Sequence, residues 1–163
     1  MRVTPKTPKG RKIAGSAAAM ALAVSFIGTW EGLELKAYRD IVGVLTVCYG
    51  ETRGVQPGDQ YTKAACDEML SREVLAFERE LDKCLKPPVD VPAETKVAFV
   101  SWAYNVGTGA ACRSTLVRKA NRGDLVGACN ELPRWNRAGG RVIRGLTNRR
   151  ISERSLCHRG LDA

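Results

Sequence analysis

An uncharged stretch, residues 13–30, follows a basic N-terminal flank and limits where this chain can reside and how it can fold. Residues 1–12 carry five basic residues and no acidic one. As a helix the stretch would be about 27 Å long at roughly 1.5 Å per residue, just short of the ~30 Å hydrocarbon core of a bilayer. Eleven of its eighteen residues are Gly, Ala, Ser or Thr, so it should hold a membrane weakly. The flank would stay in the cytoplasm, which places the rest of the chain outside.

Four interpretations of this stretch remain open. It could be a cleaved signal peptide, a permanent anchor, an uncleaved anchor that later leaves the membrane, or a plain buried helix. Small-residue cleavage sites are present at residues 19–21 and 21–23. Because Glu31 follows Trp30 without a linker, cleavage there would leave very little helix before a candidate catalytic residue. This favours the uncleaved, releasable anchor and divides the chain into residues 1–30 and residues 31–163.

The net charge of +9 is spread along the whole chain and points to a polyanionic partner. Nucleic acid, anionic lipid and bacterial cell wall all fit, and so does a surface that is basic only for solubility. The 163 residues suit one domain, or one domain with an appendage, and 44% hydrophobic residues exclude wholesale disorder.

The body is predicted to be mainly α (α+β). Residues 34–51 gather β-branched and aromatic residues around Gly43, which predicts a small hairpin or sheet. Apolar residues at residues 66–84 recur every three to four positions, which predicts an amphipathic helix of about twenty residues that ends at Pro87 and Pro88. Further helices are predicted over residues 92–107, 114–120, 124–132 and 147–157, the last closed by Gly160.

Glu31 and Asp40 could perform glycoside hydrolysis, which needs a protonated acid at the leaving oxygen and a second group on the opposite face of the sugar. Glu31 ends an apolar segment, a setting that would desolvate its carboxyl and favour the protonated form. Asp40 follows Arg39 in a polar stretch and should remain ionised. By itself this spacing is not specific, because surface carboxylates nine residues apart occur in most proteins.

The sequence around these carboxylates resembles the catalytic segment of phage-type lysozymes, glycoside hydrolase family 24. Those enzymes carry a Glu, an Asp nine residues on and a Thr six further, which match Glu31, Asp40 and Thr46. Residues 104–107 resemble the end of the family's central helix, and residues 134–150 its C-terminal lobe. The resemblance implies a lysozyme-like fold, in which a small β-sheet lobe near the N-terminus and a helical lobe are joined by a long helix. One departure is Glu51, because many members have a histidine at this position. The resemblance therefore does not give the hydrogen bonds of the sheet around Glu51.

The resemblance also implies the roles of these residues. Glu31 would be the acid, Asp40 would activate or position water, and Thr46 would hold that water. The candidates for substrate binding or positioning are Asn105, Trp135 and Arg150. Trp135 lies in a loop where Arg and Gly alternate, residues 134–141, and could equally be a packing residue of the core. No cofactor and no metal are expected.

A subset of the family, the signal-anchor-release endolysins, has this kind of weakly apolar, uncleaved N-terminal segment. Resemblance to them implies export, inactive tethering to the host inner membrane through residues 13–30, and later release into the periplasm. While that segment lies in the bilayer, Glu31 is held at the interface and cannot lie opposite Asp40. After release, the same residues would fold onto the body as the helix that presents Glu31.

The six cysteines have no C-x-x-C spacing, and a single histidine accompanies them, so a zinc site is not expected. In the cytosol they would be buried thiols, whereas in an exported protein they form up to three disulfides with about fifteen alternative pairings. Export and the family fold together imply Cys129–Cys157 first, then Cys84–Cys112 and Cys48–Cys66.

The resemblance therefore predicts an endolysin that hydrolyses the β-1,4 bonds between N-acetylmuramic acid and N-acetylglucosamine in peptidoglycan and lyses the host cell. A monomer without a nucleic-acid partner is expected, since no recognisable nucleic-acid motif is present. Two alternatives are a lytic transglycosylase acting on the same substrate and a membrane-anchored basic binding module without catalysis.

Overall fold

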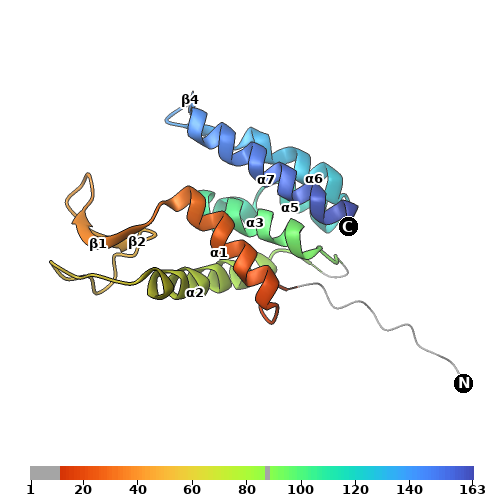
Figure 1. The fold of residues 1–163 in the computed structure, drawn as a ribbon. Coiled ribbons are helices and arrows are strands. Elements are labelled where there is room, and N and C mark those ends of the chain that lie inside the picture. Colours follow the sequence, from red (N-terminus) through yellow and green to blue (C-terminus); the bar gives the residue numbers. More distant parts are fainter. Residues whose placement is uncertain (1–11, 87–88) are drawn as a thin grey trace, which may run out of the picture.

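The computed structural model describes residues 12–86 and 89–163, and in these residues helices dominate over two small sheets (Figure 1). The predicted basic flank up to residue 11, and Pro87 and Pro88, lie outside the described residues. The elements are α1 (Ala17–Glu31), β1 (Glu34–Arg39), β2 (Leu45–Cys48), α2 (Lys63–Asp82), α3 (Ala93–Val106), α4 (Thr108–Cys112), α5 (Thr115–Asn121), α6 (Leu125–Glu131), the 3-10 turn η1 (Leu132–Arg134), β3 (Arg137–Ala138), β4 (Arg141–Val142) and α7 (Arg144–Asp162). The predicted mainly α fold with a small sheet near the N-terminus is confirmed.

Helix α3 is the centre of the helical packing. Residues 95–103 are all buried, including Phe99 and Trp102. Helices α1, α2 and α7 all contact α3, and α7 makes the most extensive of these contacts. The antiparallel β1–β2 hairpin extends beyond one end of α1 and α2 (Figure 1). The molecule therefore has a small sheet lobe and a larger helical lobe.

Helix α1 is built from the uncharged N-terminal stretch and packs into the common core. Its buried face is formed by Ala19, Ala23 and Ile27, which are spaced four residues apart and therefore lie on one side of the helix. Gly28 lets the Tyr49 ring lie against α1, since a Cβ at this position would lie 2.9 Å from the ring. The helix continues through Trp30 to Glu31, so the folded structure has no break between residues 30 and 31. In the described part of the chain, none of the helices has the length and apolarity needed to cross a membrane.

Helix α7 is longer than predicted, and the prediction that Gly160 closes it was wrong. The helix begins at Arg144 and runs through Gly160 to Asp162. A Cβ on Gly160 would lie 2.6 Å from the backbone nitrogen of Thr95, so this glycine permits the close approach of α7 to α3. Pro92 was predicted to be the first residue of a helix, but it is the N-cap residue that precedes α3. Helix α4 and the short β3–β4 hairpin were not predicted.

Three disulfides connect the helices and the sheet, and they are the pairs that the family resemblance implied. Cys48–Cys66 joins β2 to α2, Cys84–Cys112 joins the end of the α2 segment to α4, and Cys129–Cys157 joins α6 to α7. No cysteine is left free.

Candidate functional site

Glu31 is the last residue of α1, and Gly32 ends the helix with a φ of 77°. The Glu31 side chain is 23% exposed, and its Oε1 accepts a hydrogen bond of 2.8 Å from Arg149 Nη1. The sequence predicted a desolvated, apolar setting for this carboxyl. The structure differs, because a buried guanidinium is its direct partner and one part of the carboxyl reaches solvent.

Arg149 is the residue that orients Glu31, and two further contacts hold it in place. Its Nε donates to Glu153 Oε1 at 3.1 Å, and its Nη2 donates to the backbone carbonyl of Ser101 at 3.1 Å. Its side chain is only 5% exposed. Because α3 supplies Ser101 and α7 supplies Glu153, the packing of these two helices fixes the position of the guanidinium that Glu31 meets.

Arg150, the candidate positioning residue that the family resemblance implied, pairs with Glu153 and not directly with Glu31. Its side chain is fully buried and pairs with Glu153, with 2.9 Å between Nη2 and Oε1. Ser101 Oγ also donates to Glu153 Oε1, at 2.7 Å. Burial lowers the pKa of Arg150 and raises the pKa of Glu153, and the charges of the two groups partly oppose these effects. Adjacent helix residues point about 100° apart, so only Arg149 reaches Glu31.

Asp40 and Thr46 lie on the β1–β2 hairpin, and both bind the backbone of Val44. Asp40 Oδ1 accepts hydrogen bonds from the backbone amides of Val42, at 3.0 Å, and Val44, at 2.8 Å. Thr46 Oγ1 donates to the carbonyl of Val44 at 3.1 Å, and its side chain is buried. Within the described residues Oδ2 of Asp40 accepts no hydrogen bond, and the Thr46 hydroxyl has already given its proton. Both oxygens can therefore accept a hydrogen bond from a water molecule.

The structure thus brings Asp40 and Thr46 together through Val44, whereas the partner of Glu31 among the described residues is Arg149. Asn105 lies exposed in the last turn of α3. Trp135 packs edge-on against the buried Trp102 with 5.2 Å between ring centroids, which favours the packing role for this tryptophan.

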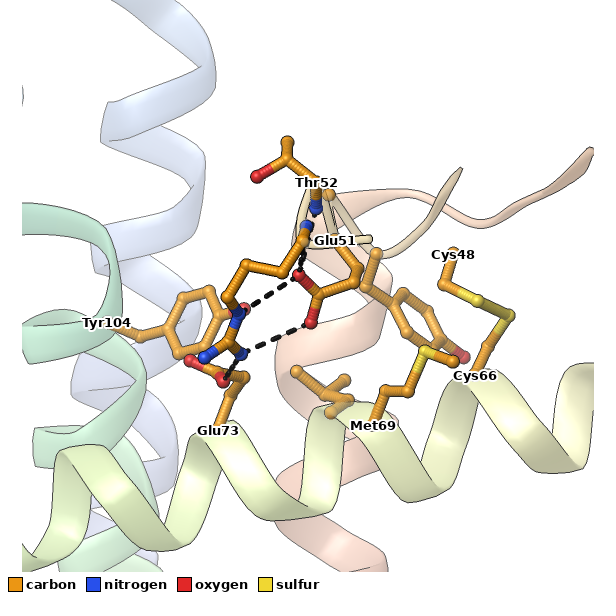
Figure 2. Close-up of a pocket in the computed structure, with 11 residues that line it drawn as sticks. Cys48, Glu51, Thr52, Cys66, Met69, Glu73 and Tyr104 are labelled. Carbon is orange, nitrogen blue, oxygen red and sulfur yellow. Dashed lines mark hydrogen bonds and ion pairs between the residues drawn. A yellow bond between two sulfur atoms is a disulfide. The ribbon is translucent and has the colours of Figure 1, made fainter. Parts of the chain in front are cut away.

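A pocket of about 240 Å³ lies between the end of β2, the loop that follows it and α2 (Figure 2). Glu51 is at its centre and accepts hydrogen bonds from the backbone amides of Thr52, at 2.9 Å, and Arg53, at 2.8 Å. The Arg53 guanidinium pairs with both Glu51 and Glu73 of α2. At the position where many family members have a histidine, Glu51 is therefore paired with Arg53, which supplies the positive charge between two carboxylates.

Tyr104 lines the same pocket from the side of α3 (Figure 2). Burial raises the pKa of its hydroxyl to about 12, and the negative charges of Glu31, Glu73 and Glu51 add to this shift. Tyr104 is therefore a neutral hydrogen-bond donor close to the candidate acid. The site residues predicted from the sequence did not include Arg149, Arg53, Glu73 and Tyr104. For Arg53, an available signal was the basic residue two positions after the unusual Glu51.

The stability contributed by Glu51 is expected to depend on pH. The Arg53 guanidinium and nearby backbone amides lower the pKa of Glu51 below its ordinary value of 4.5, against the opposing effect of partial burial. The folded chain therefore binds fewer protons at Glu51 than the unfolded chain does. This contribution is fully present above the ordinary pKa and is lost as the pH falls through the lower folded-state pKa.

Urea unfolding of the parent chain and of Glu51→Gln checks this expectation. The variant should be less stable near neutral pH, and the difference in unfolding free energy should shrink below about pH 4. Glu68→Gln is the matched control, since Glu68 is 74% exposed and should give a small difference that changes little with pH. A Glu51 difference that grows on acidification would contradict the assignment.

Comparison with protein families places these residues in a known context. Residues 28–153 match the family described as phage lysozyme. The chain is 46% identical over 128 residues to a protein named SAR-endolysin from bacteriophage PS119, a match that covers 78% of this chain and 75% of that protein.

Two solved structures of the endolysin Lyz of phage P1 show the same fold to different extents. The active form has a TM-score of 0.74 at 28% identity and covers 90% of this chain and 95% of its own. The secreted inactive form has a TM-score of 0.55 at 26% identity and covers 85% of this chain and 94% of its own. The arrangement described here is therefore more similar to the active form.

Proposed function

Because this chain belongs to the phage lysozyme family, we propose that Glu31 is the general acid with which it hydrolyses the β-1,4 bonds between N-acetylmuramic acid and N-acetylglucosamine of peptidoglycan. The chain is a glycoside hydrolase, an endolysin whose activity lyses the host cell. The observation that carries the assignment of Glu31 is its hydrogen bond to Arg149 at the end of a docked α1. A fixed, partly exposed carboxyl at that point can deliver a proton to the oxygen that leaves the sugar.

Asp40 and Thr46 act on the opposite face of the sugar. Asp40 is held by two backbone amides through Oδ1, so Oδ2 is oriented and free to accept a proton from an attacking water. The Thr46 oxygen accepts a second hydrogen bond from that water, since its own proton is used by Val44. Together they hold the water in a fixed orientation before attack.

Arg149 takes the positioning role that the family resemblance gave to Arg150. Its guanidinium keeps the Glu31 carboxyl in one orientation and stabilises the carboxylate that remains after proton transfer. Asn105 is exposed in the last turn of α3 and is assigned to substrate contact. Trp135 contributes by packing the loop that precedes α7 onto Trp102.

Mass analysis of the fragments released from purified sacculi tests the reaction class. A hydrolase adds water and gives reducing N-acetylmuramic acid ends, and we expect these as the main product from the parent chain. A lytic transglycosylase gives anhydro ends without water, and their predominance would contradict the role of Asp40. A binding module without catalysis would release no fragments.

The N-terminal stretch gives the chain a second, tethered state in this proposal. Residues 1–30 serve first as basic flank and signal anchor, which holds the chain inactive in the host inner membrane with the body, residues 31–163, in the periplasm. Residues 13–30 then leave the bilayer and dock, the chain acts as a monomer, and the catalytic domain has two lobes. The name of the PS119 relative and the greater similarity to the active P1 endolysin support this order of events.

Fractionation of expressing cells tests this localisation. Full-length protein should appear first in the membrane fraction and later in the soluble periplasmic fraction. A soluble product that begins near residue 22 or 24 would show cleavage and contradict release of the intact segment.

A further inference from the structure

Glu78 of α2 is a buried acidic residue that the proposed reaction does not use. Its side chain is 2% exposed, and both carboxylate oxygens accept hydrogen bonds from the N-terminal segment. Oε1 accepts from the backbone amide of Ile13 at 2.7 Å, and Oε2 accepts from that of Ala14 at 3.0 Å. Among the described residues Glu78 has no other hydrogen bond and no ion pair. Two peptide groups just before α1 therefore satisfy this buried carboxylate.

This arrangement couples the position of the N-terminal segment to Glu78, because the backbone amides of that segment are the donors to its buried carboxylate. A buried charged group that loses its hydrogen-bond partners is strongly unfavourable, because it can neither return to water nor find another donor. Ile13 adds to the attachment, since its side chain is fully buried in the core. When residues 13 and 14 are elsewhere, Glu78 is left without the two donors that it has in the folded chain.

The two ends of α1 are held by different groups. Glu78 holds the segment just before the helix begins, and Arg149 holds Glu31 where it ends. Between them α1 buries Ala19, Ala23 and Ile27 and packs the partly buried side chains of Met20, Leu22, Val24 and Phe26 against the core. This apolar packing holds α1 on α2 and α3, and the directional hydrogen bonds at its two ends add a preference for one position along them.

We propose that Glu78 is a positioning residue for Glu31: by binding the amides of Ile13 and Ala14 it fixes α1 in the register that places Glu31 against Arg149. The inference depends on the proposed role of Glu31 as the acid. Glu78 acts through α1 alone and touches no substrate. Its loss therefore lowers the fraction of molecules with a correctly placed acid and leaves substrate binding by the others unchanged.

The test compares two variants that break this contact with two matched controls in the purified full-length chain. Glu78→Gln keeps the shape of the side chain but turns one acceptor oxygen into a donor that faces another donor. Ala14→Pro leaves Glu78 intact and removes one of the two amides that it binds. The controls are Glu80→Gln, on the same helix but half exposed, and Ala17→Pro, at the first position of α1 where proline is tolerated.

We expect both contact variants to lower kcat on peptidoglycan by about tenfold or more, with KM within about twofold of the parent value. Amide hydrogen exchange over residues 13–31 should rise by about tenfold or more, while exchange in α3 stays slow. Both controls should keep the parental kcat and exchange. If Glu78→Gln does not fold, Ala14→Pro decides the question by the same measurements.

Parental kcat in both contact variants would overturn the proposal, and so would a lower kcat with unchanged exchange over residues 13–31. The exchange measurement needs no substrate, so it separates this inference from the proposed function. If Glu31→Gln kept full activity while Glu78→Gln loosened residues 13–31, the role of Glu31 would fail and the attachment by Glu78 would stand.

Discussion

Replacing Glu31 with Gln is expected to lower the rate of peptidoglycan hydrolysis by about 10²- to 10⁴-fold, which is the usual contribution of a general acid. The amide has the shape of the carboxyl, and its oxygen can still accept the hydrogen bond from Arg149, so α1 should stay docked. What is lost is the proton for the leaving oxygen. Turbidity loss of purified sacculi measures the rate, and thermal unfolding checks that the fold is retained.

The control for this prediction is Glu34→Gln. Glu34 lies three residues further on, at the start of β1, and it is exposed. This variant carries the same chemical change and should hydrolyse sacculi at the parental rate. Hydrolysis by Glu31→Gln at the parental rate would remove Glu31 from the mechanism and leave the reaction to another acid.

Removing the charge of Glu153 is expected to destabilise the chain by about 3–5 kcal/mol, as is typical when one partner of a buried ion pair is lost. Glu153 is fully buried and is the shared acceptor for Arg149, Arg150 and Ser101. Glu153→Ala would leave the fully buried Arg150 without a counter-charge and would free one side of Arg149. Urea unfolding measures the change in free energy.

Glu68→Ala serves as the control for Glu153→Ala. In the part of the chain that the structure describes, Glu68 pairs only with the exposed Arg72 on the surface of α2, so its loss should change the unfolding free energy by less than about 1 kcal/mol. The Glu153 variant should also hydrolyse peptidoglycan more slowly at temperatures where it remains folded, because Arg149 then holds Glu31 less firmly. A stability within about 0.5 kcal/mol of the parent would contradict the central place of Glu153 in this cluster.

Local patterns in the sequence were sufficient for the main elements. The β-branched residues around Gly43 predicted the hairpin, and the spacing from Cys66 to Cys84 predicted α2, because both signals depend on neighbours in the chain. The assignment of Glu31, Asp40 and Thr46 needed the family resemblance, since two carboxylates nine residues apart are common. Their roles remain proposals.

The details that depend on how helices pack together could not be predicted in this way. Whether Arg149 or Arg150 contacts Glu31 depends on how α7 is rotated about its axis where it packs on α3. The sequence around two adjacent arginines does not indicate that rotation. Glycine often follows the last residue of a helix, which is why Gly160 was predicted to close α7. It lies inside α7 instead, at a point where Thr95 of the facing helix leaves no room for a side chain. The sequence did indicate that Glu78 is unusual. It lies four residues after Val74 on the apolar face of α2, where an acidic residue needs a partner.

The three disulfides divide the chain into successive closed loops, residues 48–66, 84–112 and 129–157, and none of these loops overlaps another. The cysteines therefore pair in consecutive order, the first with the second, the third with the fourth and the fifth with the sixth, so that each bridge can form without waiting for a distant partner. The first cysteine is Cys48, and no covalent bridge involves the residues before it. In the proposed tethered state all three disulfides of the body can therefore form before α1 docks, and docking of α1 is a reversible, non-covalent step.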